Sequence, residues 1–244
     1  MPALTFETMG TVVSVRLGDS DADAAELVGT VFRRWDEQFS LYREDSELSR
    51  VARGDLRLTA ASQSLRDCYA LALNWRECTQ GVFTPHRADG VIDLSGVVKA
   101  LAIAEAGAAL TACGQANWSI NAGGDVLVSA DAGHPEWVVA IVDPGNRGDV
   151  IAKVPLGHPL RAVATSGSAE RGEHIWTALN GEPSPFRQVS VFAGDIVTAD
   201  VLATAIVAGG EATLNEMTER FTIDVLAVLR DGQLLATPGL RRAE

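Results

Sequence analysis

The chain is poor in cysteine, has no excess of positive charge and contains no long uninterrupted hydrophobic run. Its three cysteines, Cys68, Cys78 and Cys113, are an odd and scattered set, which excludes a disulfide framework and a zinc site and predicts reduced thiols in the core. The formal net charge of −12 argues against a nucleic-acid partner, because nucleic acid requires a basic surface. A phosphate-bearing ligand is still compatible, since a divalent cation or backbone N–H groups supply local positive potential.

Membrane and export signals are also missing. No window of the sequence approaches a membrane span. The opening residues, "MPALTFETMGTVVSVRLG", lack the positive region and the continuous apolar region of a signal peptide. We therefore expect no membrane span and a cytoplasmic location, unless a leader preceded this sequence.

The composition is that of a globular protein. Hydrophobic residues make up 47% of the 244 residues and charged residues 21%, which is typical of a chain with a substantial core. This length permits one large domain or two small ones. No linker, repeat or low-complexity segment marks a boundary, so we expect a single domain over residues 1–244.

Hydrophobic periodicity predicts an α+β fold, with helices leading and strands dominating the second half. The predicted helices are 19–42, a segment opening at Thr59, 94–113, about 198–209, and 211–220. The predicted strands are 11–17, 118–130, 137–144, 161–169 and 187–194, followed by a closing hairpin over 223–237 with Asp231-Gly232 at its turn.

Asp200 and Thr204 are unexpected in the otherwise apolar stretch "DIVTADVLATAIVAGG". They are four residues apart and therefore share one face of the predicted helix. In a structural interpretation, Asp200 complements the helix dipole from the first turn and the Thr204 hydroxyl bonds back to the Asp200 carbonyl. In a functional one, the two oxygens bind Mg²⁺, which takes one or two carboxylates. The spacing alone does not decide between them.

Other polar segments have two interpretations each. "NAGGD", 121–125, is a tight bend or a place of close ligand approach. "ATSGSAERGEHIW", 164–176, is a surface loop or a phosphate site in which His174 accepts a proton. Asp93 and Lys99 flank the start of the 94–113 helix. We expect Asp93 to lie near the N-cap of this helix and Lys99 to be a solvated helix residue. The sequence has no P-loop, nucleophile elbow or dinucleotide-binding pattern.

An ordered set of motifs runs through nearly the whole chain: "ETMGT" at 7–11, "FSLYREDSELSRV" at 39–51, "VIDLSGVVKALAIAEA" at 91–106, then "INAGGDVLV", "AVATSGS", "HI" at 174–175 and "TADVLATA". Each motif is weak alone. Together and in this order they resemble the ApbE family of FAD:protein FMN transferases. The resemblance implies a single ApbE-like, T-fold-related domain.

The resemblance also implies a mechanism and a set of site residues. Such enzymes bind FAD and use Mg²⁺ to move its FMN half onto a Thr hydroxyl of an acceptor flavoprotein, releasing AMP. Asp200, Thr204 and the backbone carbonyl of Gly96 would be metal ligands, and His174 would take the acceptor proton. The residues implied to line the FAD site are Met9, Tyr42, Val82, Phe83, Thr84, Asp93, Lys99 and Ile175.

The sequence departs from the family pattern in four places, one of which is a short segment between "GVFTP" and "VIDLSG". Ala100 replaces a glycine, Val197 stands where some members carry a further Asp, and the residues after His174 differ. These departures imply two alternatives to the transferase: a FAD pyrophosphatase that releases FMN and AMP, or a non-catalytic FAD-binding member.

Overall fold

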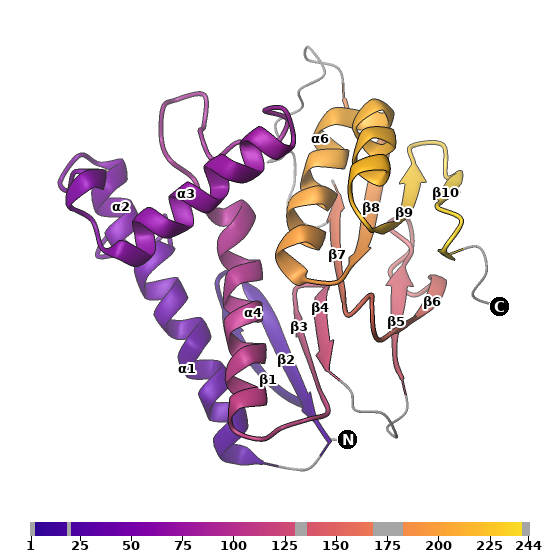
Figure 1. The fold of residues 1–244 in the computed structure, drawn as a ribbon, viewed down its shortest axis with the longest axis horizontal. Helices are drawn as coiled ribbons and strands as arrows, with labels where there is room; N and C mark the ends of the chain where they lie inside the picture. The colour runs from indigo at the N-terminus through magenta and orange to yellow at the C-terminus, as the bar shows by residue number, and fades with distance from the viewer. Residues whose placement is uncertain (1–2, 19–20, 130–135, 168–182, 241–244) are drawn as a thin grey trace. The chain divides into compact units, whose positions relative to one another are not determined.

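The computed structural model describes residues 3–18, 21–129, 136–167 and 183–240 (Figure 1). The chain divides into two units, Met1–Gly123 and Gly124–Glu244, each with its own internal contacts. Both units combine helices with antiparallel strands, so the α+β class is confirmed. The expectation of a single domain over the whole chain stays a prediction.

The first unit carries a short sheet and a group of helices. β1, β2 and β3 pair antiparallel in that order. α1 packs against β1 and α4, and α4 packs against β3. The elements are β1 (Ala3–Thr8), β2 (Thr11–Leu17), α1 (Ala22–Phe39), α2 (Glu47–Ala52), the 3₁₀ helix η1 (Leu58–Ala60), α3 (Gln63–Cys78), α4 (Ser95–Ala112) and β3 (Trp118–Ala122).

The second unit is built on the antiparallel strands β4, β7, β8, β9 and β10, which pair in that order. β5 and β6 form a separate two-stranded sheet. The elements are β4 (Asp125–Ser129), β5 (Trp137–Val142), β6 (Val150–Leu156), β7 (Ala162–Gly167), β8 (Phe186–Ala193), α6 (Ile196–Arg220), β9 (Asp224–Leu229) and β10 (Leu234–Ala236).

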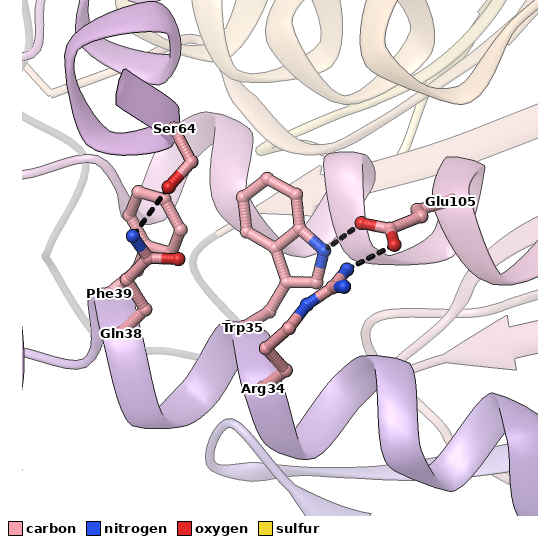
Figure 2. A pocket seen from close by; sticks show the side chains of 6 residues that line it. All are labelled: Arg34, Trp35, Gln38, Phe39, Ser64 and Glu105. Atoms are coloured by element: carbon pink, nitrogen blue, oxygen red, sulfur yellow. Dashed lines mark hydrogen bonds and ion pairs between the residues drawn. The ribbon is translucent and has the colours of Figure 1, made fainter. Parts of the chain in front are cut away.

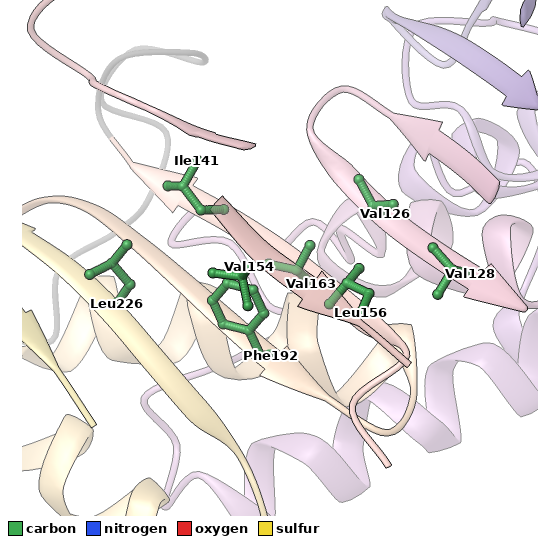
Figure 3. Close-up of a cluster of buried hydrophobic side chains, with 8 residues drawn as sticks. All are labelled: Val126, Val128, Ile141, Val154, Leu156, Val163, Phe192 and Leu226. Carbon is green, nitrogen blue, oxygen red and sulfur yellow. The ribbon is translucent and has the colours of Figure 1, made fainter. Parts of the chain in front are cut away.

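The two faces of β7 contact different parts of the second unit. Successive residues of a strand point to opposite faces, so Val163 and Ser166 lie on opposite sides. Val163 belongs to a buried apolar cluster that joins β4, β7, β8 and β9 to the β5–β6 hairpin (Figure 3). Ser166 contacts Thr204 of α6, and α6 packs along β7 and β8. The sheet is therefore covered by the hairpin on one face and by α6 on the other.

α6 contains a break at Gly210. This glycine has φ 70° and ψ −157°, far from helical values, and separates 196–209 from 211–220. The sequence predicted two helices that divide at this point, and the break confirms the division. Nearly every residue of the first half is buried, as expected for a helix with so few polar side chains.

The structure differs from the predicted elements where turns and caps outweigh periodicity. The predicted strand 118–130 is two strands, because Gly123 and Gly124 adopt positive φ values of 62° and 94° and form a tight turn. The helix expected from Thr59 begins only after Ser62, whose side chain accepts the Leu65 N–H at 3.2 Å. β1, α2 and β6 were not predicted, because α2 is short and most residues of β1 and β6 are exposed or only half-buried.

α4 and α6 are long and apolar enough to cross a membrane by length and composition alone. In α4, 50% of the apolar window is buried inside the protein, and in α6 the share is 72%. Core helices of soluble proteins meet the same criterion, so the two helices are only weak evidence for a membrane span.

All three cysteines are free thiols, but they differ in burial. Cys68 lies in the core, Cys78 is half-buried and Cys113 is exposed. The expectation of core thiols is therefore right for Cys68 and wrong for Cys113. Burial raises the pKa of the Cys68 thiol to about 12, so this thiol stays protonated at neutral and moderately alkaline pH.

We expect an alkylating reagent to modify Cys113 rapidly in the native protein and to leave Cys68 intact. Raising the pH from about 7 to about 9 should not change this, because both values lie below the Cys68 pKa of about 12. Mass spectrometry of the labelled peptides measures the two sites. Comparable labelling of Cys68 and Cys113 would contradict the burial of Cys68.

Gly123→Ala should destabilise the first unit by at least about 2 kcal/mol, since it combines a left-handed backbone with a clash. A Cβ on Gly123 would strike the Thr11 hydroxyl, whereas one on Gly114, with φ 91°, meets nothing within 4 Å. Gly114→Ala is therefore the matched control, with only the backbone cost of about 1–2 kcal/mol. Denaturant unfolding compares them, and equal losses would show that the Thr11 contact is unimportant.

Candidate functional site

Phe83 and Gly96, which belong to the implied FAD and metal sets, lie in contact in the first unit. A Cβ added to Gly96 would come within 2.8 Å of the Phe83 Cε2 atom. Phe83 is buried and its ring has little room to move. Glycine is therefore required at the first turn of α4, and the 82–84 segment packs directly onto the start of this helix. Val82 itself is half-buried.

Hydrogen bonds hold this segment in place. The Thr79 hydroxyl accepts the Phe83 N–H at 3.1 Å. The Thr84 hydroxyl accepts the N–H two residues further on, at 3.2 Å. The Asp93 N–H donates to the Pro85 carbonyl at 2.8 Å. The implied FAD residues Phe83, Thr84 and Asp93 thus belong to one locally fixed loop.

Asp93 and Lys99 differ in how well the sequence predicted them. The Asp93 carboxylate accepts the Ser95 N–H at 2.9 Å, directly before the N-cap residue Leu94. The near-cap interpretation is confirmed. Lys99 is only 7% exposed, so the expected solvated lysine is wrong. An ammonium group buried to this extent needs compensating polar contacts, which makes Lys99 a candidate for ligand contact or for a structural role.

Met9 and Tyr42 both lie in turns. Met9 and Gly10 form the two-residue turn between β1 and β2, with φ values of 50° and 69°. Positive φ is costly for methionine. Tyr42 follows α1 and is 97% exposed, on a loop anchored by the Ser46 hydroxyl, which donates to the Ser40 carbonyl at 2.5 Å. The loop therefore holds an aromatic ring out in solvent.

In the second unit, Asp200 lies beyond the first turn of α6. The N-cap is Asp195, whose carboxylate accepts the Thr198 N–H at 2.8 Å and the Thr198 hydroxyl at 2.7 Å. The helix-dipole interpretation of Asp200 is therefore wrong, because Asp195 has that role and the dipole effect fades within the first turn. Asp200 is only 5% exposed, so the presence of a carboxylate at this buried position needs an explanation other than the helix dipole.

The Thr204 hydroxyl also departs from the structural interpretation. It lies 3.1 Å from the Ser166 hydroxyl at the end of β7, and either oxygen can donate. Three other helical threonines, Thr30, Thr111 and Thr218, donate to the carbonyl four residues earlier, as does Thr79 at the C-cap of α3. The hydrogen-bonding of Thr204 is thus directed away from its own helix and toward the sheet.

This donor set fits Mg²⁺. Asp200 and Thr204 share a helix face, and Thr204 meets Ser166, so a carboxylate and two hydroxyls gather there with no soft ligand. Within the described ranges no group of three or more His, Cys, Asp or Glu side chains is found; this set has one carboxylate. Gly96 belongs to the other unit, so ligation by its carbonyl stays a prediction.

Two implied site residues, His174 and Ile175, lie outside the residues that the structure describes. The roles assigned to them, proton acceptance and flavin contact, stay predictions.

Two polar residues near the end of β7, Ser166 and Asp125, were not singled out from the sequence. The sequence analysis noted the polar segments that contain them, 164–176 and 121–125, without naming either residue. The pairing of Ser166 with Thr204 depends on tertiary packing. Asp125 is fully buried and accepts the Thr165 N–H at 3.0 Å. A carboxylate beginning the apolar strand pattern "DVLVS" was the signal that could have identified it.

A separate hollow of about 380 Å³ is lined by residues of α1, α3 and α4 and contains none of the implied site residues (Figure 2). Its polar groups bond to one another: the Trp35 indole N–H donates to Glu105 at 2.8 Å, and the Gln38 amide donates to Ser64 at 2.6 Å. Trp35 also stacks on Phe39. These contacts explain the hollow as part of the helix packing.

Gly96→Ala should lower the free energy of unfolding by about 1–3 kcal/mol, because the new methyl group overpacks against Phe83. Adding Phe83→Leu should recover part of this loss by removing the ring edge. Gly29→Ala in α1 is the control: its Cβ meets only the end of the Arg33 side chain at 3.3 Å, so a neutral or stabilising effect is expected. Thermal unfolding tests the cycle, and additive effects would contradict the contact.

The comparisons with known proteins agree with this fold. Solved structures with a similar fold include an ApbE protein from Thermotoga maritima, with TM-score 0.80 and 20% identity over 98% of both chains. The flavin transferase ApbE from Vibrio cholerae has TM-score 0.77 and 21% identity, again over 98% of both chains. The flavinyl transferase ApbE from Pseudomonas stutzeri has TM-score 0.78 and 19% identity over 98% of this chain and 96% of that one.

A search of curated protein sequences finds no match. The profile of the ApbE family matches residues 9–89 and 86–229, which is most of the chain and includes every implied site residue. The chain therefore belongs to the ApbE family.

Proposed function

We propose that the protein is a Mg²⁺-dependent flavin transferase that moves the FMN half of FAD onto a threonine hydroxyl of an acceptor flavoprotein. Family membership and the names of the Vibrio and Pseudomonas relatives support the flavin chemistry. The observation that carries the metal requirement is the buried Asp200 carboxylate, one turn from a Thr204 hydroxyl that faces Ser166. Such oxygen donors suit a cation that also binds substrate phosphates.

The proposed step is a phosphoryl-group displacement. The acceptor threonine oxygen forms a bond to the phosphorus of the FMN half, and the bond from that phosphorus to the bridging oxygen breaks. The bridging oxygen leaves with AMP, and the threonine proton passes to a base, for which His174 is the candidate. Asp200, Thr204 and the Gly96 carbonyl would hold Mg²⁺, which would supply positive charge beside the pyrophosphate.

We assign flavin contacts to the first unit. The exposed Tyr42 ring on its anchored loop can stack on a planar ring system without first leaving a packed environment. Met9 stands in a turn of fixed, strained geometry, which positions its side chain before any ligand binds. The loop that carries Phe83, Thr84 and Asp93 is likewise preformed.

A FAD pyrophosphatase is the second candidate. Val197, one turn before Asp200 in α6, brings no further carboxylate to this helix face. In this reaction a water oxygen replaces the threonine oxygen as the attacking group, so FMN and AMP are released without an acceptor. A non-catalytic FAD-binding protein would release neither.

Asp200→Ala should reduce FMN transfer at least about a hundredfold, since loss of about 3 kcal/mol of charge stabilisation corresponds to that factor. Asp195→Asn is the matched control on the same helix: asparagine caps equally well, so activity should stay within about twofold. Intact-mass analysis of an acceptor bearing a flavinylation-type threonine, with FAD and Mg²⁺, measures the transfer.

The outcomes separate the candidates. FMN added to the acceptor supports the transferase, and AMP release without an acceptor supports the pyrophosphatase. FAD binding that is indifferent to Mg²⁺, with no AMP, supports the non-catalytic protein. Full transfer by Asp200→Ala would overturn the proposed metal site.

A further inference from the structure

The last residues of β7 present two hydroxyls to opposite faces of the sheet, and each has a hydroxyl partner. The Thr165 and Ser190 oxygens are 2.8 Å apart, on the face toward the β5–β6 hairpin. The Ser166 and Thr204 oxygens are 3.1 Å apart, on the face toward α6. The two pairs share the same strand, but only the second touches the proposed cation site. The first pair is therefore a matched control for the second.

The end of β7 is held from both neighbouring strands. On the β4 side, the ladder ends at the pair Val126–Val163, and the buried Asp125 carboxylate continues it by accepting the Thr165 N–H at 3.0 Å. On the β8 side, a Cβ on Gly167 would collide with the Arg187 carbonyl. Ser166 lies between these two contacts, and its backbone is therefore fixed on either side.

A threonine hydroxyl that binds a cation keeps its proton, which must be donated away from the metal. Ligand orientation of this kind is a general function of the groups around a metal site. Among the described residues, Ser166 provides the acceptor within reach of the Thr204 hydroxyl. With Thr204 donating to Ser166, a lone pair of the Thr204 oxygen is left to face the cation.

We propose that Ser166 is a positioning residue that accepts a hydrogen bond from the Thr204 hydroxyl and directs the Thr204 oxygen toward the cation, and that Asp125 fixes Ser166 by anchoring the β7 backbone. This rests on the proposed function of Asp200 and Thr204 as metal ligands. Neither Ser166 nor Asp125 needs to touch the metal. The chain thus supplies more to the site than its two side-chain ligands.

The test measures binding of Mn²⁺ alone to the full-length protein by electron paramagnetic resonance, beside the Mg²⁺ dependence of FMN transfer. Ser166→Ala should raise both the Mn²⁺ Kd and the half-saturating Mg²⁺ concentration about tenfold, the lower end for loss of such a supporting contact. Ser166→Thr, which keeps the hydroxyl, should restore most of the affinity. Ser190→Ala, the control on the opposite face, should change the Mn²⁺ Kd less than about twofold.

Asp125 is tested through its coupling to Ser166. Asp125→Asn keeps an oxygen acceptor and should bind Mn²⁺ normally, whereas Asp125→Ala should match Ser166→Ala, and the double variant should be no worse than either single variant. If Asp125→Ala does not fold, hydrogen exchange of the Thr165 amide in Asp125→Asn replaces it. Lost protection with an unchanged Mn²⁺ Kd then overturns the role of Asp125.

The proposal is overturned if the wild-type protein binds Mn²⁺ no more tightly than Ser166→Ala. It is also overturned if the increases in Mn²⁺ Kd caused by Asp125→Ala and Ser166→Ala multiply in the double variant. These results are distinct from failure of the transferase. Absent FMN transfer with the expected order of Mn²⁺ affinities would overturn the transferase and leave the positioning role intact. FMN transfer by the wild-type protein, together with an unchanged Mn²⁺ affinity of the Ser166→Ala variant, would support the transferase and overturn the positioning role.

Discussion

Burial of α6 on the sheet of the second unit limits where that unit can present polar groups. The first half of this helix is apolar and almost wholly enclosed, and burying a carboxylate costs free energy unless polar groups or a cation compensate. Asp200 is nevertheless placed there, on the same helix face as Thr204, whose hydroxyl meets Ser166 at the end of β7. The polar face of α6 is consequently narrow, and its position is set by packing rather than by a flexible loop.

The first unit uses a different constraint, the contact between Phe83 and Gly96. It joins a loop that has little secondary structure to the rigid start of α4. The loop is further fixed by the Thr79 and Thr84 hydroxyls and by the Asp93 N–H. Phe83, Thr84 and Asp93, which the family resemblance implies in FAD binding, are therefore held in place by the chain itself. Less ordering entropy would be lost when a ligand binds to such a loop.

Local signals explain which features could be predicted from the sequence. The helix expected over 94–113 is observed as Ser95–Ala112, and the Asp231-Gly232 hairpin turn lies between β9 and β10. Periodicity and turn chemistry are contained in the residues themselves. The burial of Lys99 and the pairing of Ser166 with Thr204 could not be predicted, because both depend on which distant segments pack together.

The place of α6 in the chain has a consequence for folding. β8 and β9 are antiparallel neighbours, yet α6 is inserted between them in sequence. The ends of this long connection must meet before β8 and β9 can pair, and the loss of chain entropy is recovered only when α6 docks on the sheet. The oxygen cluster at Thr204 exists only where α6 is docked on β7, because Ser166 and Thr204 come from these two elements. A partly folded chain would lack this cluster, so that the metal-dependent chemistry we propose would be confined to the native state.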